Sequence, residues 1–83
     1  MHRYPQRMIN VEVTDRDALE EADQVWRAVE VSEVRLGQEG RVLVRASGTE
    51  PLVRVMVEAR TEDLASTHAE AIADVVRETL GSP

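Results

Sequence analysis

Residues 40–59, GRVLVRASGTEPLVRVMVEA, decide the fold of this 83-residue chain. Apolar side chains occupy every second position in residues 41–46 and again in residues 53–59. This is the period of a β-strand that buries one face. The polar segment SGTEP (residues 47–51) separates the two runs, so the stretch predicts two consecutive strands joined by a short loop.

Residues 7–14 alternate in the same way and predict a further strand before the hairpin. Residues 1–6 are expected to be a linker or entry segment, because Pro5 discourages regular structure. Residues 7–83 are then a single domain, since a chain of this length has room for only one core.

Two helices are predicted on either side of the hairpin. Asp15 is placed to cap the first helix, and the sequence leaves open whether residues 30–35 extend it or form a short strand. Thr61 is placed to cap the second, which Gly81 ends. The expected buried stripe of the second helix consists of Leu64, Ala65, Ala69, Ile72, Ala73, Val76 and Leu80. The order strand–helix–strand–strand–helix predicts an α+β two-layer sandwich, an antiparallel sheet with two helices on one face.

The composition argues against several classes of function. A net charge of −6 and an aromatic content of 2% argue against nucleic-acid binding. No apolar run is long enough to span a membrane, and residues 1–7 lack the apolar stretch of a signal peptide. The absence of cysteine excludes disulfides and thiolate chemistry within the chain. We therefore expect a cytoplasmic protein with neither a nucleic-acid partner nor a membrane partner.

Strand alternation places two arginines on the same face of the hairpin. If the valines of both strands face the helices, Arg45 and Arg54 lie together on the outer face, close to the loop. The same face carries apolar side chains at Met8, Leu43 and Met56, and also at Leu52. We expect another domain or a ligand to cover part of this face.

Five residues of the loop region form a candidate site for a tetrahedral anion: Arg45, Ser47, Gly48, Thr49 and Arg54. Guanidinium groups stay charged and match pairs of phosphate oxygens. The two hydroxyls can donate hydrogen bonds, and Gly48 permits the positive φ that would turn neighbouring N–H groups into one concavity.

Glu50 and Pro51 complete the loop as orienting residues. We expect the Glu50 side chain to orient an arginine and Pro51 to stiffen the loop exit. Chemistry alone leaves open a plain hairpin connection whose arginines are merely solvated.

Residues 45–51, RASGTEP, followed by Arg54, resemble the phosphate-binding loop of the α-D-phosphohexomutases. The segments YPQ (residues 4–6), GRVLVR (40–45) and RVMVE (54–58) are similar to the C-terminal domain of one branch, the bacterial phosphoglucosamine mutases. The resemblance implies the fourth domain of a four-domain enzyme, with a fold like that of the TATA-binding protein. It also implies that Arg45, Ser47, Gly48 and Thr49 contact a substrate phosphate, with Arg54 as a further contact.

The activity that the resemblance implies is an intramolecular phosphoryl exchange between glucosamine 6-phosphate and glucosamine 1-phosphate, in amino-sugar and cell-wall precursor synthesis. A phosphoserine of the first domain and Mg²⁺ held by aspartates of the second would perform the transfer. This chain would bind the phosphate that does not react, so it contains no catalytic residue or metal ligand and is expected to be inactive without the other three domains. The alternatives are the same domain of a phosphomannomutase or phosphoglucomutase, and a stand-alone regulatory module that binds a small anion.

Three residues outside the loop are given structural interpretations. His68 is expected on the last helix in a surface or half-buried structural position, and no histidine spacing predicts a zinc site. His2 lies in the N-terminal segment. Trp26 fits the apolar stripe of the first helix, which favours core packing over stacking on a sugar.

Overall fold

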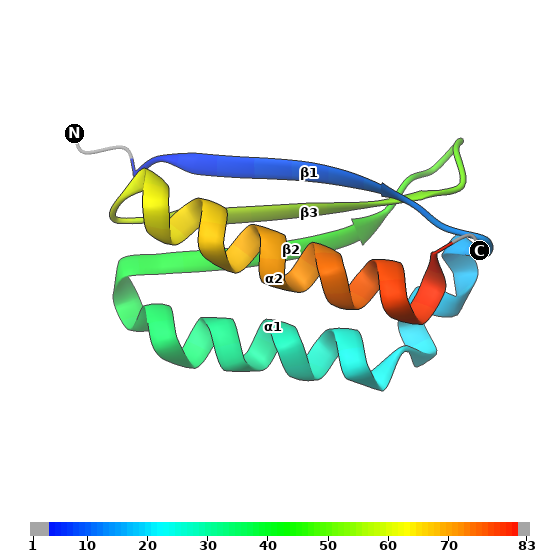
Figure 1. Ribbon diagram of the computed structural model, residues 1–83, viewed down its shortest axis with the longest axis horizontal. Helices are drawn as coiled ribbons and strands as arrows, with labels where there is room; N and C mark the ends of the chain where they lie inside the picture. The colour runs from blue at the N-terminus through cyan, green and yellow to red at the C-terminus, as the bar shows by residue number, and fades with distance from the viewer. Residues whose placement is uncertain (1–3, 82–83) are drawn as a thin grey trace.

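A three-stranded antiparallel sheet with two helices on one face makes up the computed structural model, which describes residues 4–81 (Figure 1). The strands are β1 (Gln6–Glu12), β2 (Gly40–Ala46) and β3 (Leu52–Ala59). The helices are α1 (Asp23–Leu36) and α2 (Glu62–Leu80), with short 3₁₀ segments η1 (Arg16–Glu21) and η2 (Gly37–Glu39). This architecture confirms the predicted α+β two-layer sandwich.

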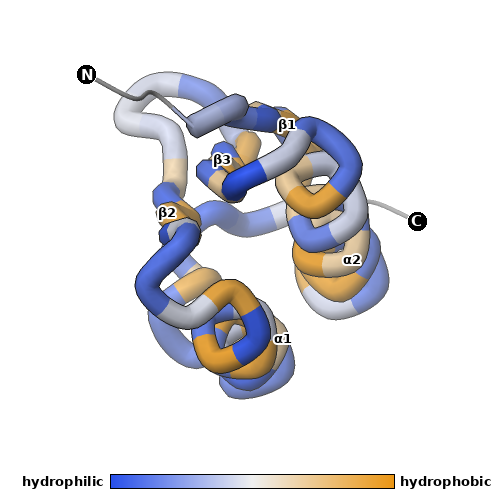
Figure 2. Tube along the Cα trace, turned by 90° about the vertical axis from the view of Figure 1, so that its left-hand side faces the viewer, coloured by the Kyte–Doolittle hydropathy of each residue, from blue (hydrophilic) through white to orange (hydrophobic). Residues whose placement is uncertain are grey.

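β3 is the central strand, because the sheet order is β1-β3-β2 and both pairings are antiparallel. Figure 2 looks along the layers and shows the strands on one side, with α2 beneath β1 and β3 and α1 beneath β2. Val53, Val55 and Val57 of β3 are fully buried against the helices. The burial follows from the alternation in the sequence, which directs every second side chain to the helical face.

The core is aliphatic, and its largest fully buried side chains come from both layers. Ile72 and Val76 of α2, together with Val25 of α1, have no exposed surface and belong to the same core cluster as the valines of β3. Burying a side chain of this size contributes about 1.5–3 kcal/mol to the free energy of unfolding. Both helices therefore depend on the sheet for most of their stability.

The first helical segment differs from the prediction. Asp15 caps the 3₁₀ segment η1, where its carboxylate accepts a hydrogen bond from the Asp17 N–H at 2.9 Å. Ala22, with ψ 76°, separates η1 from α1, so the apolar repeat spans two segments that are not collinear. A sequence repeat does not register such a break, since Ala22 is compatible with an uninterrupted helix.

The sequence left open whether residues 30–35 extend the first helix or form a short strand. In the structure α1 continues through them and ends at Leu36. Gly37 follows with φ 60°, a conformation that favours glycine, and its N–H bonds to the Glu33 carbonyl. At the start of α2, the Thr61 hydroxyl accepts from the Leu64 N–H at 3.2 Å, as the capping prediction requires. Leu64 itself is 37% exposed, and so it lies at the margin of the buried stripe.

The entry segment expected at residues 1–6 is partly structured. Gln6 belongs to β1, and the Pro5 carbonyl accepts a hydrogen bond from the Ala59 N–H at 3.1 Å. Residues 1–3, including His2, lie outside the described residues. The proposed boundary of the domain at residue 7 stays a prediction.

The face of the sheet opposite the helices carries side chains in rows across the strands. One row is Gln6, Glu58 and Arg41, the next is Met8, Met56 and Leu43, and the third is Asn10, Arg54 and Arg45. In the apolar row, Met8 and Leu43 are 53% and 44% exposed. The third row ends at the β2–β3 loop, where the candidate site lies.

Candidate functional site

Arg45 and Arg54 lie directly opposite each other, as cross-strand partners in the β2–β3 hairpin. Both are exposed on the face that the helices leave open. Together with Ala46, Ser47 and Gly48 they line a cavity of about 190 Å³ at the hairpin end. The register therefore confirms the predicted shared face of the two arginines, whereas their contact with a ligand stays a prediction.

The arginine pair has no carboxylate partner within residues 4–81. Within the same range, Arg54 Nε donates only to the Asn10 side-chain oxygen, at 3.3 Å. Like charges directly opposite each other in a sheet are destabilising. An anion between them would remove this repulsion, so the arrangement is suited to binding one.

Hydrogen bonds inside the loop fix its shape. The Ser47 N–H donates to the Leu52 carbonyl at 2.9 Å and closes the hairpin. The Ser47 hydroxyl oxygen accepts from the N–H groups of Thr49 at 3.3 Å and Glu50 at 3.2 Å. Because that oxygen acts as the acceptor in both bonds, the hydroxyl hydrogen stays available for donation to a ligand.

Gly48 does not adopt the positive φ that the loop sequence was expected to need. Within residues 4–81 the only glycine in that conformation is Gly37. A Cβ added at Gly48 would meet no atom within 4 Å, so neither backbone torsion nor packing within the chain requires a glycine there. The missing side chain instead leaves open space at a residue that lines the cavity.

The remaining loop residues, Thr49, Glu50 and Pro51, are not among those that line the cavity. Thr49 is exposed. The Glu50 carbonyl, rather than its carboxylate, contacts an arginine: it accepts from Arg16 Nη1 at 3.3 Å. The Pro51 carbonyl accepts from the Val13 N–H at 2.9 Å, which ties the loop exit to the chain just after β1.

Sequence reasoning missed Arg16, which is the residue of η1 that contacts the loop. Its Nη1 atom also donates to the Ser47 carbonyl, at 3.0 Å, across a separation of 31 residues. No local pattern marks this position, because the contact forms only when η1 packs beside the hairpin. The break at Ala22 is what leaves η1 as a separate segment there.

Trp26 is not packed in the core, contrary to the prediction from the apolar stripe. Its side chain is 37% exposed and lies outside the buried core cluster, and its indole N–H donates to the Leu19 carbonyl at 2.8 Å. This hydrogen bond links α1 to η1 and stabilises the junction between them. Trp26, Arg16 and Arg45 also line a separate, open depression beside β2.

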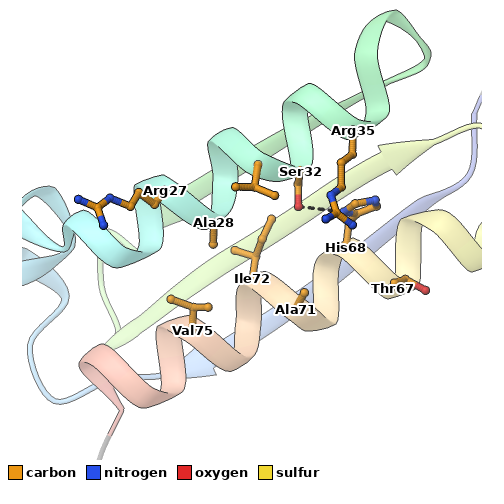
Figure 3. A pocket seen from close by; sticks show the side chains of 10 residues that line it. Arg27, Ala28, Ser32, Arg35, Thr67, His68, Ala71, Ile72 and Val75 are labelled. Atoms are coloured by element: carbon orange, nitrogen blue, oxygen red, sulfur yellow. Dashed lines mark hydrogen bonds between the residues drawn. The ribbon is translucent and has the colours of Figure 1, made fainter.

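A groove between α1 and α2 is lined by side chains of both helices (Figure 3). In it, His68 Nδ1 is 2.9 Å from the hydroxyl of Ser32, a buried side chain. His68 thus lies half-buried on α2, in the position that the sequence predicted. Within residues 4–81 no three His, Cys, Asp or Glu side chains are placed to hold a metal ion. The helices of the same range are also too short or too polar to cross a membrane.

Comparison with known proteins defines the class of this chain. The model of the phosphoglucomutase/phosphomannomutase C-terminal domain matches residues 8–75. The match begins at Met8 in β1, includes β2 and β3, and ends within α2. The chain belongs to this domain family.

Curated relatives narrow the similarity to one branch. The chain is 53% identical over 81 residues to the phosphoglucosamine mutase of Staphylococcus aureus and 51% identical over 81 residues to that of Geobacillus thermodenitrificans. Each alignment covers 98% of this chain and 18% of the relative. The chain therefore spans about a fifth of the length of the curated relatives that it matches.

Solved structures agree with this assignment. A structure of N-acetylphosphoglucosamine mutase from Aspergillus fumigatus matches with a TM-score of 0.80 and 32% identity, over 92% of this chain and 16% of that one. A second structure of the same fungal enzyme, in complex with GlcNAc-6P and magnesium, matches with a TM-score of 0.78 and 31% identity. It covers 95% of this chain and 16% of the fungal one. These similarities confirm the predicted fold and superfamily.

Proposed function

We propose that this chain is the phosphate-binding C-terminal domain of a phosphoglucosamine mutase, an enzyme that interconverts glucosamine 6-phosphate and glucosamine 1-phosphate. The observation that carries the proposal is the pair of cross-strand arginines, Arg45 and Arg54, which line one cavity with Ser47 and Gly48. The similarity to curated phosphoglucosamine mutases over nearly the whole chain supports the choice of branch.

Each residue of the site has a distinct task in this proposal. Arg45 and Arg54 neutralise the dianionic phosphate and donate paired hydrogen bonds to its oxygens. Ser47 donates its free hydroxyl hydrogen, and the open space at Gly48 lets a phosphate oxygen approach the backbone. Thr49 supplies a further hydroxyl from the loop tip after a rotation of its side chain.

The contribution to catalysis is positioning. Phosphate binding at a site remote from the reacting group supplies binding energy that orients the sugar, and this lowers the barrier without any bond being made or broken here. Charge-assisted hydrogen bonds contribute about 1.5–3 kcal/mol each, so four or five of them suffice for micromolar to millimolar affinity.

Transfer of the phosphoryl group takes place on other parts of the whole protein. The phosphoserine, the Mg²⁺ and the residues that recognise the sugar would lie on three further domains, in line with the length of the relatives. Mg²⁺ would there stabilise charge on the transferring group. The cytoplasm is the expected location of the enzyme, because the substrates of a phosphoglucosamine mutase are metabolic sugar phosphates.

Titration of the ¹⁵N-labelled chain with glucosamine 6-phosphate tests the proposal. The amides of Ser47, Gly48 and Thr49 should shift in a saturable way, and Arg45→Ala should move this titration to about 10- to 150-fold higher ligand concentration while leaving the spectrum of the free protein otherwise unchanged. Inorganic phosphate should compete at the same amides. Absence of shifts at high millimolar ligand, or shifts confined to the groove between α1 and α2, would contradict the assignment.

A further inference from the structure

We infer that Arg16 is a positioning residue for the phosphate-binding loop, and this inference deepens the proposed function. Arg16 Nη1 donates to two carbonyls of the loop, those of Ser47 at 3.0 Å and Glu50 at 3.3 Å. The two acceptors stand on either side of Gly48 and Thr49. One guanidinium nitrogen therefore fixes both ends of the segment that would meet the ligand.

The direction of the Ser47 carbonyl determines the direction of the next N–H group. In a trans peptide the C=O of one residue and the N–H of the following one point in opposite directions. No cis peptide occurs within residues 4–81. Since the Ser47 carbonyl points toward Arg16, the Gly48 N–H points away from Arg16. Gly48 is among the residues that line the small cavity and Arg16 is not. An N–H that is not directed at Arg16 is therefore available to a ligand bound there.

Holding the two carbonyls back also removes an electrostatic obstacle. A carbonyl oxygen carries partial negative charge, and if it turned toward a phosphate dianion it would repel the ligand. The positive charge of Arg16 stabilises the carbonyls in their present direction through charge-assisted hydrogen bonds. The Ser47 and Glu50 carbonyls are thereby held toward Arg16, while the Gly48 N–H points away from it.

The position of Arg16 is itself fixed by its surroundings. Asp15 caps the segment that begins at Arg16, and Leu19, one turn later, is 5% exposed and belongs to the core cluster. Before it, the Val13 and Thr14 N–H groups bond to the carbonyls of Pro51 and Leu80, both at 2.9 Å. The Arg16 side chain is half-buried. The guanidinium group therefore reaches the loop from a backbone segment that is itself held in place.

The test compares Arg16→Lys and Arg16→Gln with the wild-type chain. Lysine keeps the charge, but its nitrogen lies about one bond short of the position that Arg16 Nη1 occupies. Glutamine removes the charge as well. Arg35→Gln is the matched control, because it also removes one positive charge but lies in the last turn of α1, at the other end of the molecule from the loop (Figure 1).

Two measurements are made on each variant. The first is the heteronuclear NOE of the Gly48 and Thr49 amides without ligand, which reports loop order on the picosecond to nanosecond timescale. The second is the dissociation constant for glucosamine 6-phosphate. We expect both Arg16 variants to lower the NOE of these amides and to weaken binding about 10-fold, while Arg35→Gln changes neither.

The outcomes separate the two levels of the proposal. If wild-type chain does not bind the sugar phosphate but Arg16→Lys still disorders the loop, the positioning role stands and the proposed function fails. If Arg16→Lys binds as tightly as wild type and only Arg16→Gln is weakened, charge alone accounts for the effect and positioning is refuted. Loop amides that stay equally ordered in all three variants refute it as well.

Discussion

Gly48→Ala should make this protein more stable and, at the same time, poorer at binding its ligand. An added Cβ meets no atom within 4 Å, and the backbone of Gly48 does not have the positive φ that would strain an alanine. Replacing glycine by alanine at such a position reduces the entropy of the unfolded chain and stabilises by about 0.4–1 kcal/mol. For a domain of this size, that corresponds to a rise of about 2–8 °C in the midpoint of thermal unfolding.

Affinity should change in the opposite direction. The methyl group would occupy open space at a residue that lines the cavity of about 190 Å³. A phosphate oxygen would then be kept from the backbone N–H, with loss of about 1.5–3 kcal/mol of charge-assisted hydrogen bonding. This corresponds to a dissociation constant for glucosamine 6-phosphate raised by about 10- to 150-fold.

The assay pairs thermal unfolding, followed by circular dichroism, with titration by NMR. Gly37→Ala is the control, because Gly37 has φ 60° at the end of α1. That variant should lose about 1–3 kcal/mol of stability and bind as wild type does, because φ 60° with ψ −137° is a conformation that is essentially restricted to glycine. If Gly48→Ala binds glucosamine 6-phosphate normally, no ligand approaches the backbone at Gly48, and the reasoning on the open space is wrong. If it is destabilised, the loop conformation described above is wrong.

Three further predictions concern the site and the core. Arg45→Ala should weaken sugar-phosphate binding by about 10- to 150-fold and leave the unfolding midpoint within 2 °C or so, because an exposed side chain is lost with no buried partner left behind; normal turnover of the complete enzyme carrying this change would count against the assigned role. Gly40→Ala should destabilise by more than about 1 kcal/mol in urea unfolding, since its Cβ would lie 2.5 Å from the Glu58 carbonyl oxygen; a neutral result would show that β2 and β3 can separate there at no cost. Ile72→Ala should reduce the free energy of unfolding by about 2–5 kcal/mol because the side chain is fully buried, whereas Ile72→Val should cost only about 0.5–1.5 kcal/mol; equal effects would show that the core collapses around the cavity.

The sheet and the arginine pair could be predicted from the sequence because both depend on a two-residue period. Alternation in residues 41–46 and 53–59 fixes which side chains share a face, and cross-strand pairing then follows from the shortness of the loop. The helices were predictable to the extent that their ends carry local signals, such as Thr61 and Gly37.

The features that could not be predicted depend on contacts between distant segments. The break at Ala22 and the exposure of Trp26 follow from the way η1 packs against the hairpin, which no apolar repeat encodes. The hydrogen bonds of Arg16 join residues far apart in sequence for the same reason. The conformation of Gly48 was misjudged because the residue type permits a positive φ without requiring it.

One guanidinium group of the site is carried by the central strand of the sheet and the other by an edge strand. Arg54 belongs to β3, which has a neighbour on each side, whereas Arg45 belongs to β2, which has only one. Amide hydrogens of a border strand exchange through local opening at a smaller free energy than those of the middle strand. Fraying of β2 at its last residues would carry Arg45 outward and leave Arg54 in place. If the proposed function holds, a bound phosphate ester would then be released by a small fluctuation at one border while the remainder of the domain stays folded.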